Sequence, residues 1–167
     1  MSNLDAVLAD NRAAVDELIA AAERCAPAWT DPWAPGKWSP SQIVEHVAMS
    51  LEEGGNVVSE RQAKLPSLPF FVRPLARMFF NRVVRTGKFP KAKTNKAMNP
   101  IAGPASVDEG KQRLLAAMDV FDRDCRARMA NSPMSTSTAF GRVSVEDYAR
   151  FVALHTRHHT KQMPVVL

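Results

Sequence analysis

The 167-residue sequence has no apolar run that approaches the roughly 18–20 residues of a membrane-spanning helix. Its first ten residues carry two acids and no basic stretch, so we expect no secretory signal peptide and a cytoplasmic protein. The two cysteines, Cys25 and Cys125, match no metal or redox spacing, which excludes a cysteine-based motif. We expect both to be buried free thiols in a reducing compartment, although a disulfide between them stays open.

Signals for β-strands are almost absent, because no hairpin dipeptide lies between alternating apolar runs. Helical spacing of apolar residues is instead present in four long segments. The first covers 4–27, the second opens at Ser39 and Pro40 and reaches Val58, the third begins near Ser106, and the fourth covers 144–164. These segments predict an all-α fold, an up-down four-helix bundle, in a single domain of residues 1–167.

Acidic residues are missing from 61–107, between the second and third segments. This stretch holds ten basic residues, whereas the whole chain has a net charge of only +5. Residues 65–104 form a basic, Pro-rich insert that carries six of the twelve prolines, and a short helical stripe covers 71–83. The insert could be a solvated basic face, or a cover of a site mouth where Arg77, Arg82 and Arg85 attract carboxylates. It could also contact a membrane surface or a partner through 68–85. Nucleic acid is disfavoured, because no recognised reading module is present.

Three of the four histidines lie within five residues near the end of the chain. His155 and His159 are four apart, so on a helix they lie on one face, in series with the apolar positions before them. The remaining histidine, His46, lies on the second helical segment. Three imidazoles from two facing helices would leave open positions on a metal ion, as in a reactive site. His158 points off this face and is expected at the rim.

Other interpretations of these residues stay open. Each histidine could be a hydrogen-bonded core residue, and no built-in catalytic acid of the HExxH kind accompanies them. Gln162 could hold a metal ligand by a hydrogen bond or simply pack. Tyr148, the only tyrosine, could donate to a substrate oxyanion or be a core residue. The three tryptophans are expected to cap one end of the bundle.

Two motifs resemble the DinB/YfiT-like superfamily. Residues 38–47 (WSPSQIVEHV) resemble the opening of that family's second helix. Residues 140–148 (FGRVSVEDY), followed by His155, His159 and Gln162, resemble its closing motif. The resemblance covers effectively the whole chain. One departure is that Thr138 and Ala139 stand where many relatives carry a histidine.

The resemblance implies a divalent metal, nickel or zinc, held by His46, His155 and His159. It also implies a homodimer and a thiol-dependent transferase or isomerase that uses a low-molecular-weight thiol such as bacillithiol, mycothiol or glutathione. We therefore expect a metal-dependent enzyme, an S-transferase or a hydrolase, that activates a thiol or water against a small-molecule substrate. The alternative is a non-catalytic metal-binding or stress-response protein on the same fold.

Overall fold

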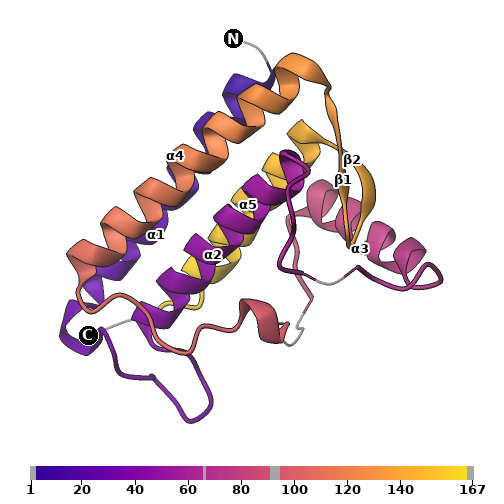
Figure 1. Ribbon diagram of the computed structural model, residues 1–167. Helices are drawn as coiled ribbons and strands as arrows, with labels where there is room; N and C mark the ends of the chain where they lie inside the picture. The colour runs from indigo at the N-terminus through magenta and orange to yellow at the C-terminus, as the bar shows by residue number, and fades with distance from the viewer. Residues whose placement is uncertain (1–2, 66, 91–94, 165–167) are drawn as a thin grey trace.

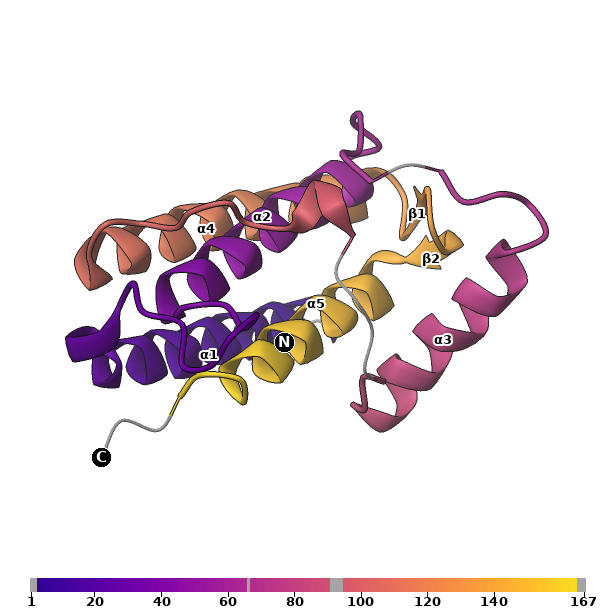
Figure 2. The same ribbon diagram turned by 90° about the horizontal axis from the view of Figure 1, so that it is seen from below.

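The computed structural model describes residues 3–65, 67–90 and 95–164. Two lysines of the basic insert, Lys91 and Lys93, lie outside this range. The described residues are mainly helical. In chain order the elements are α1 (Asn3–Arg24), the 3-10 helix η1 (Ala26–Ala28), α2 (Pro40–Val58), α3 (Arg73–Thr86), the 3-10 helix η2 (Lys96–Met98), α4 (Val107–Asn131), β1 (Met134–Ser137), β2 (Gly141–Ser144) and α5 (Val145–Thr160). The long helices α1, α2, α4 and α5 lie side by side, and α3 lies to one side of them, next to the hairpin (Figures 1 and 2).

The predicted starts of the second, third and fourth long helices are confirmed, because each of these three has a serine cap. Ser39 and Gln42 form a capping box at the start of α2, with Pro40 at the first helical position. The Ser106 hydroxyl accepts from the backbone N–H of Glu109 at the start of α4. Ser144 caps α5 in the same way. These caps satisfy backbone donors that would otherwise have no partner inside the helix.

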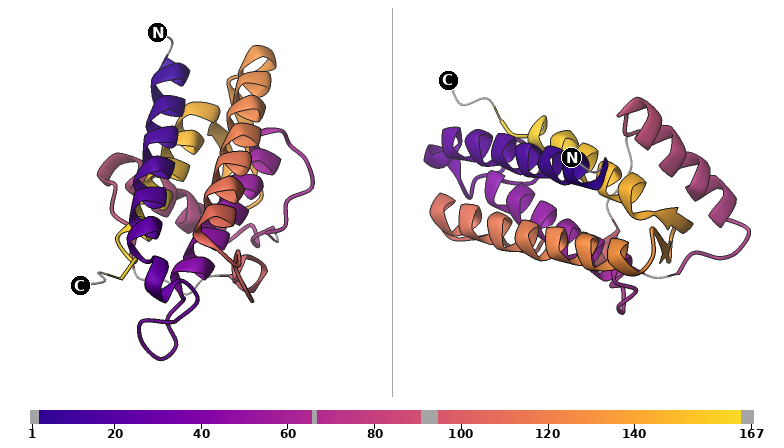
Figure 3. Two further views of the ribbon diagram at one scale, coloured as in Figure 1. Left: turned by 90° about the vertical axis from the view of Figure 1, so that its left-hand side faces the viewer. Right: turned by 90° about the horizontal axis from the view of Figure 1, so that it is seen from above.

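The predicted alternation of helix directions is wrong. The starts of α2 and α4 lie together, where Arg113 pairs with Glu45, so these two helices run in the same direction (Figure 3). Likewise, Asn3 donates to Glu146, which places the starts of α1 and α5 side by side. The physical cause is the insert. After α3, the chain returns along α2 as far as Pro104, whose carbonyl accepts from the Ser41 hydroxyl, before α4 begins.

The connection after α4 contains a β-hairpin that the sequence did not predict. Strands β1 and β2 pair antiparallel, with Ser135 opposite Val143. The buried Ser135 hydroxyl donates to the Val57 carbonyl at 2.6 Å, which ties the hairpin to the end of α2. Small polar residues occupy β1, so the strand lacks the apolar alternation by which strands are normally recognised.

The core between the long helices is apolar and contains both cysteines. Cys25 and Cys125 are buried free thiols, as predicted. Burial raises the pKa of the Cys125 thiol to about 12, so it stays protonated and unreactive. Within the described residues, no helix has the length and apolar character required to cross a membrane.

Candidate metal centre

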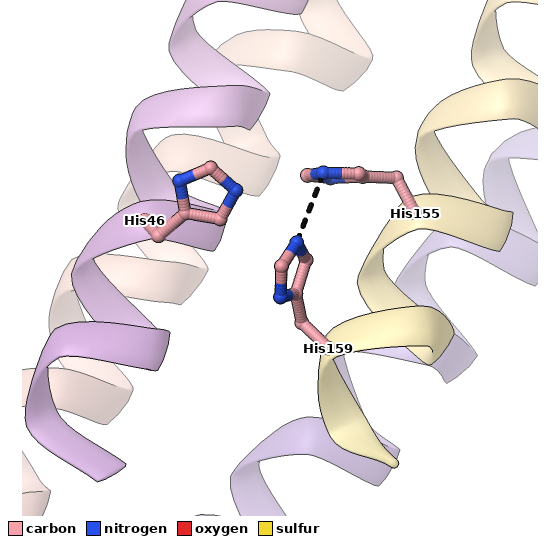
Figure 4. Close-up of side chains that lie close together, drawn as sticks. All are labelled: His46, His155 and His159. Atoms are coloured by element: carbon pink, nitrogen blue, oxygen red, sulfur yellow. Dashed lines mark hydrogen bonds between the residues drawn. The ribbon is translucent and has the colours of Figure 1, made fainter. Parts of the chain in front are cut away.

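The imidazoles of His46, His155 and His159 converge between α2 and α5 (Figure 4). One ring nitrogen from each residue lies within 4.8 Å of those of the other two. The Nε2 atoms of His155 and His159 are 3.1 Å apart, because residues four apart on a helix share a face. The His46 ring approaches from the facing helix, with its centroid 4.5 Å from that of His159.

Hydrogen bonds on the outer side of two rings orient their inner nitrogens. The Nδ1 of His46 lies 2.7 Å from the Met98 carbonyl oxygen, and the Nδ1 of His159 lies 2.9 Å from the Gln162 Oε1. Both oxygens can only accept, so each Nδ1 carries the proton. In a neutral ring the Nε2 then presents its lone pair, which is the tautomer that metal ligands require.

All three rings are neutral near pH 7. Desolvation by burial is the largest cause at each ring, and it lowers the pKa of His159 to about 3. The pKa of His155 falls well below its ordinary value for the same reason, with the neighbouring histidines adding to the effect. Burial also lowers the pKa of His46, although its hydrogen bond to Met98 opposes the shift. Neutral imidazoles are ready to bind a cation without first losing a proton.

The donor set fits a divalent transition metal. Two nitrogens bound to one tetrahedral ion with Zn–N bonds of about 2.0–2.1 Å lie about 3.3 Å apart. The separation of 3.1 Å between the Nε2 atoms of His155 and His159 is close to this value. Imidazole suits zinc, nickel, copper and iron alike. The cluster can therefore hold a metal ion with three ligands and leave further coordination positions open.

A strap of residues 95–104 covers the outer side of His46. It includes η2 and Met98, which is 6% exposed and lies against α2. Trp38 lies beside the cluster, with its ring centroid 4.7 Å from that of His46 and 6.0 Å from that of His159. Trp38 therefore forms part of the site, whereas Trp29 packs in the core. Trp33 is 55% exposed and lines the same cavity as the three histidines.

The cluster lines a cleft of about 1340 Å³. The insert forms part of the cleft wall through apolar side chains, including Phe79 and Phe89. None of Arg77, Arg82 and Arg85 lines the cleft, so the attraction of carboxylates to its mouth by these three residues stays a hypothesis without support from direct contact. Arg77 instead donates to backbone carbonyls of the hairpin, at Phe140 and Arg142, and so fastens α3 there.

The other candidate residues line the same cleft as the cluster. The amide of Gln162 bridges two histidines, because its Nε2 also lies 3.0 Å from the His158 Nε2. His158 lines the cleft but is not one of the converging ligands. Tyr148 is largely buried, which raises its pKa and keeps its hydroxyl protonated. That hydroxyl has no hydrogen-bond partner within the described part of the chain, and the residue lines the cleft, so it can donate to a ligand.

Replacement of Gln162 by leucine should weaken metal binding by about 10- to 100-fold, because His159 loses the acceptor that orients it. Competition with a chromophoric chelator measures this affinity. The Gln162→Glu variant keeps an acceptor at the same place and should bind metal almost as well as the natural chain. Equal affinities in the two variants would show that Gln162 only packs.

Sequence reasoning missed two groups of residues at the site. Met98 contributes through its backbone carbonyl, which leaves no signal in side-chain chemistry. The phenylalanines of the cleft come from four separate parts of the chain. The spacing within 71–83 included Phe79 and the motif of residues 140–148 included Phe140, but neither indicated a shared wall. For Trp38 a signal did exist, because it opens the motif that leads to His46.

Comparisons with known proteins identify a family. A family model described as protein of unknown function (DUF1569) matches residues 13–164, a span that includes all three converging histidines. Neither a comparison with curated proteins nor one with solved structures finds a match. Because the family model matches most of its length, the chain belongs to the DUF1569 family.

Proposed function

We propose that this protein is an enzyme that depends on a divalent metal, nickel or zinc, and transfers a small thiol to an electrophilic substrate. The observation that carries the proposal is the convergence of three neutral imidazoles in a wide cleft. A cation bound there would supply positive charge that lowers the pKa of a thiol or water nucleophile. Three protein ligands, rather than four, are typical of reactive sites.

The residues of the chain have distinct roles in this proposal. His46, His155 and His159 hold the cation, while Met98 and Gln162 orient two of them. Tyr148 is placed to donate a hydrogen bond to developing negative charge on the substrate. In the transfer, the thiol proton leaves to solvent, a bond forms between sulfur and carbon, and the leaving group departs with the electrons of the broken bond.

We also propose that the DUF1569 fold is a four-helix bundle of the DinB/YfiT-like superfamily. Two motifs support this relation, because residues 38–47 start α2 and residues 140–148 start α5, where the superfamily carries its ligands. The buried free thiols are compatible with the reducing cytoplasm that we expect. The homodimer implied by the resemblance stays a prediction.

Turnover with a panel of thiols and electrophiles tests the enzymatic function. The zinc- or nickel-loaded protein should consume at least one thiol, and the His155→Ala variant should show none of this activity. Retention of metal without turnover by any pair would instead favour a non-catalytic metal-binding or stress-response protein. Hydrolysis of the electrophile without thiol would identify water as the nucleophile.

A second candidate function, contact with an anionic membrane surface, is favoured by α3. Its inner face is buried through Phe80 and Val83. Leu75 and Met78 are exposed by 62% and 61% on its other face, and Phe71, just before the helix, is exposed by 71%. Three exposed cations follow along the chain: Arg82, Arg85 and Lys88. Within the described residues, no carboxylate lies close enough to pair with them. Exposed aromatic and aliphatic side chains flanked by basic ones are typical of helices that lie on anionic lipid.

The protein should therefore bind vesicles of anionic phospholipid and not vesicles of phosphatidylcholine. Each basic residue near such a surface contributes about 1 kcal/mol, so replacing Arg82, Arg85 and Lys88 by glutamine should weaken binding by about 100-fold. Co-sedimentation at low and high salt measures this. The Ile101→Ser variant is the matched control, because Ile101 is 96% exposed but lies outside α3. Equal binding to both lipids would contradict this candidate function.

A further inference from the structure

Phenylalanine rings form a continuous wall of the cleft beside the histidines. The Phe89 ring centroid lies 5.7 Å from that of His155 and 5.3 Å from that of Phe151. The wall continues from Phe151 to Phe140 at 5.4 Å and from Phe140 to Phe79 at 6.4 Å. These distances are those of aromatic rings in contact, so one apolar surface extends outward from the candidate metal centre.

The rings of this wall are available to a ligand. Phe79, Phe89, Phe140 and Phe151 all line the cleft and are only partly buried. The neighbouring Phe80 behaves differently. It is 2% exposed, contacts Phe140 and Phe151, and does not line the cleft. Phe80 therefore provides the packing beneath the wall, and the other four rings present apolar surface to whatever fills the cleft.

The cleft also has polar lining groups, and its carboxylate, Glu53, already accepts from the backbone N–H groups of Lys64 and Leu65. The three imidazoles can bind a donor atom through a metal ion, and the described cations that line the cleft are Lys37, Lys161 and His158 when protonated. A ligand that matches this surface has a metal-binding head and a mainly apolar body, because a polar body would lose hydration against four phenylalanines and, among the described residues beside them, could gain a hydrogen bond only from Tyr148.

We propose that the cleft selects small molecules in which an aromatic body carries a metal-binding head. The head binds at His46, His155 and His159, and the body stacks on Phe89 and Phe151. This inference deepens the proposed function and rests on it for the position of the head. The cleft volume of about 1340 Å³ exceeds the roughly 300–1000 Å³ of pockets for one drug-sized ligand, which leaves room for a second reactant.

A series of hydroxamates of increasing size tests the proposal. Acetohydroxamate, benzohydroxamate and 2-naphthohydroxamate carry the same metal-binding head on bodies of increasing apolar area. Titration of the zinc-loaded protein should give dissociation constants that fall by about tenfold from the first to the second and again to the third, because each ring buries apolar surface. Equal constants across the series, with acetohydroxamate bound, would overturn the proposal.

Two variants test whether the gain in affinity across the hydroxamate series comes from contact with the phenylalanine wall. Phe89→Ala and Phe151→Leu should each lose most of the gain from the aromatic rings, measured relative to the affinity of the same variant for acetohydroxamate. Phe71→Ala is the matched control, because Phe71 is exposed and lies outside the cleft. The same tenfold gain in all variants would also overturn the proposal, since the rings would then bind elsewhere.

A further binding experiment tests the phenylalanine wall independently of the metal site. N-phenyl-1-naphthylamine is a neutral aromatic fluorophore that needs no metal. Its fluorescence should rise on binding to the metal-free protein, and Phe89→Ala should weaken this binding by at least about fivefold. If the protein holds no metal, the proposed metal function fails and this measurement alone tests the aromatic wall. Unchanged binding of the fluorophore in Phe89→Ala would overturn the wall, and weakened binding would support it.

Discussion

Replacement of His159 by alanine should abolish metal binding. His159 is 5% exposed, its Nε2 lies 3.1 Å from that of His155, and its ring centroid lies 4.5 Å from that of His46. With it removed, His155 and His46 would provide only two ligands from opposite helices, too few for a stable site of this type. We expect about one zinc or nickel ion per purified natural chain and less than about one tenth of that in the variant. Elemental analysis of the two proteins measures the difference.

The neighbouring residue provides a matched control for this experiment. His158→Ala also removes one imidazole from α5, but His158 is not among the converging ligands, so this variant should keep its metal. His46→Ala, on the facing helix, should lose metal as His159→Ala does. Metal retained in both His46→Ala and His159→Ala would refute the three-histidine site.

Stability provides a second readout that does not depend on purification history. A metal that binds only the folded chain should raise the free energy of unfolding by about 2.7 kcal/mol at 100 times its dissociation constant. Chemical denaturation with and without added zinc should show this gain in the natural chain and in His158→Ala. The gain should be absent in His159→Ala, even if that variant folds normally.

Replacement of Gly103 by alanine should destabilise the protein by about 3 kcal/mol, at the upper end of the cost of overpacking. A Cβ atom at this position would lie 2.2 Å from the Ser41 carbonyl oxygen. The obstacle is backbone, so no side-chain rotation can relieve it. Ser41 is also held in place, because its N–H donates to the Trp29 carbonyl and its hydroxyl donates to the Pro104 carbonyl.

Urea unfolding of two glycine variants separates this clash from backbone strain. Gly36 has a positive φ of 73° but nothing within 4 Å of an added Cβ. Gly36→Ala should therefore lose only the roughly 1 kcal/mol that an L-residue costs in the left-handed region. Because the strap carries Met98 to His46, Gly103→Ala should also weaken metal binding, whereas Gly36→Ala should not. Equal stability of the two variants would show that the strap does not pack tightly on α2.

The elements that sequence analysis predicted best depend on local chemistry. Ser39, Ser106 and Ser144 each cap a helix through a hydrogen bond to a residue three positions ahead. The pairing of His155 with His159 depends only on the pitch of one helix. Such contacts do not depend on residues that are distant in sequence, so the sequence alone is enough to predict them.

The hairpin shows where pattern reasoning failed. Residues 134–137 read Met-Ser-Thr-Ser, with no apolar alternation. What holds β1 in place is the hydrogen bond from Ser135 to the carbonyl of Val57, 78 positions away in the chain. A long-range hydrogen bond from a small polar residue leaves no periodic signal in the sequence.

The sequence by itself determined that this is a helical protein with two histidines on one face of its last helix and a third on another helix. Only the tertiary structure decided that the third ring meets the other two, that a carbonyl 52 positions away orients it, and that α2 and α4 run in the same direction. The physical reason is the range of the interactions. Helix caps and helical pitch depend on residues three or four positions apart. The path of the insert depends instead on how the strap, α3 and the phenylalanine wall pack against helices that are distant in sequence.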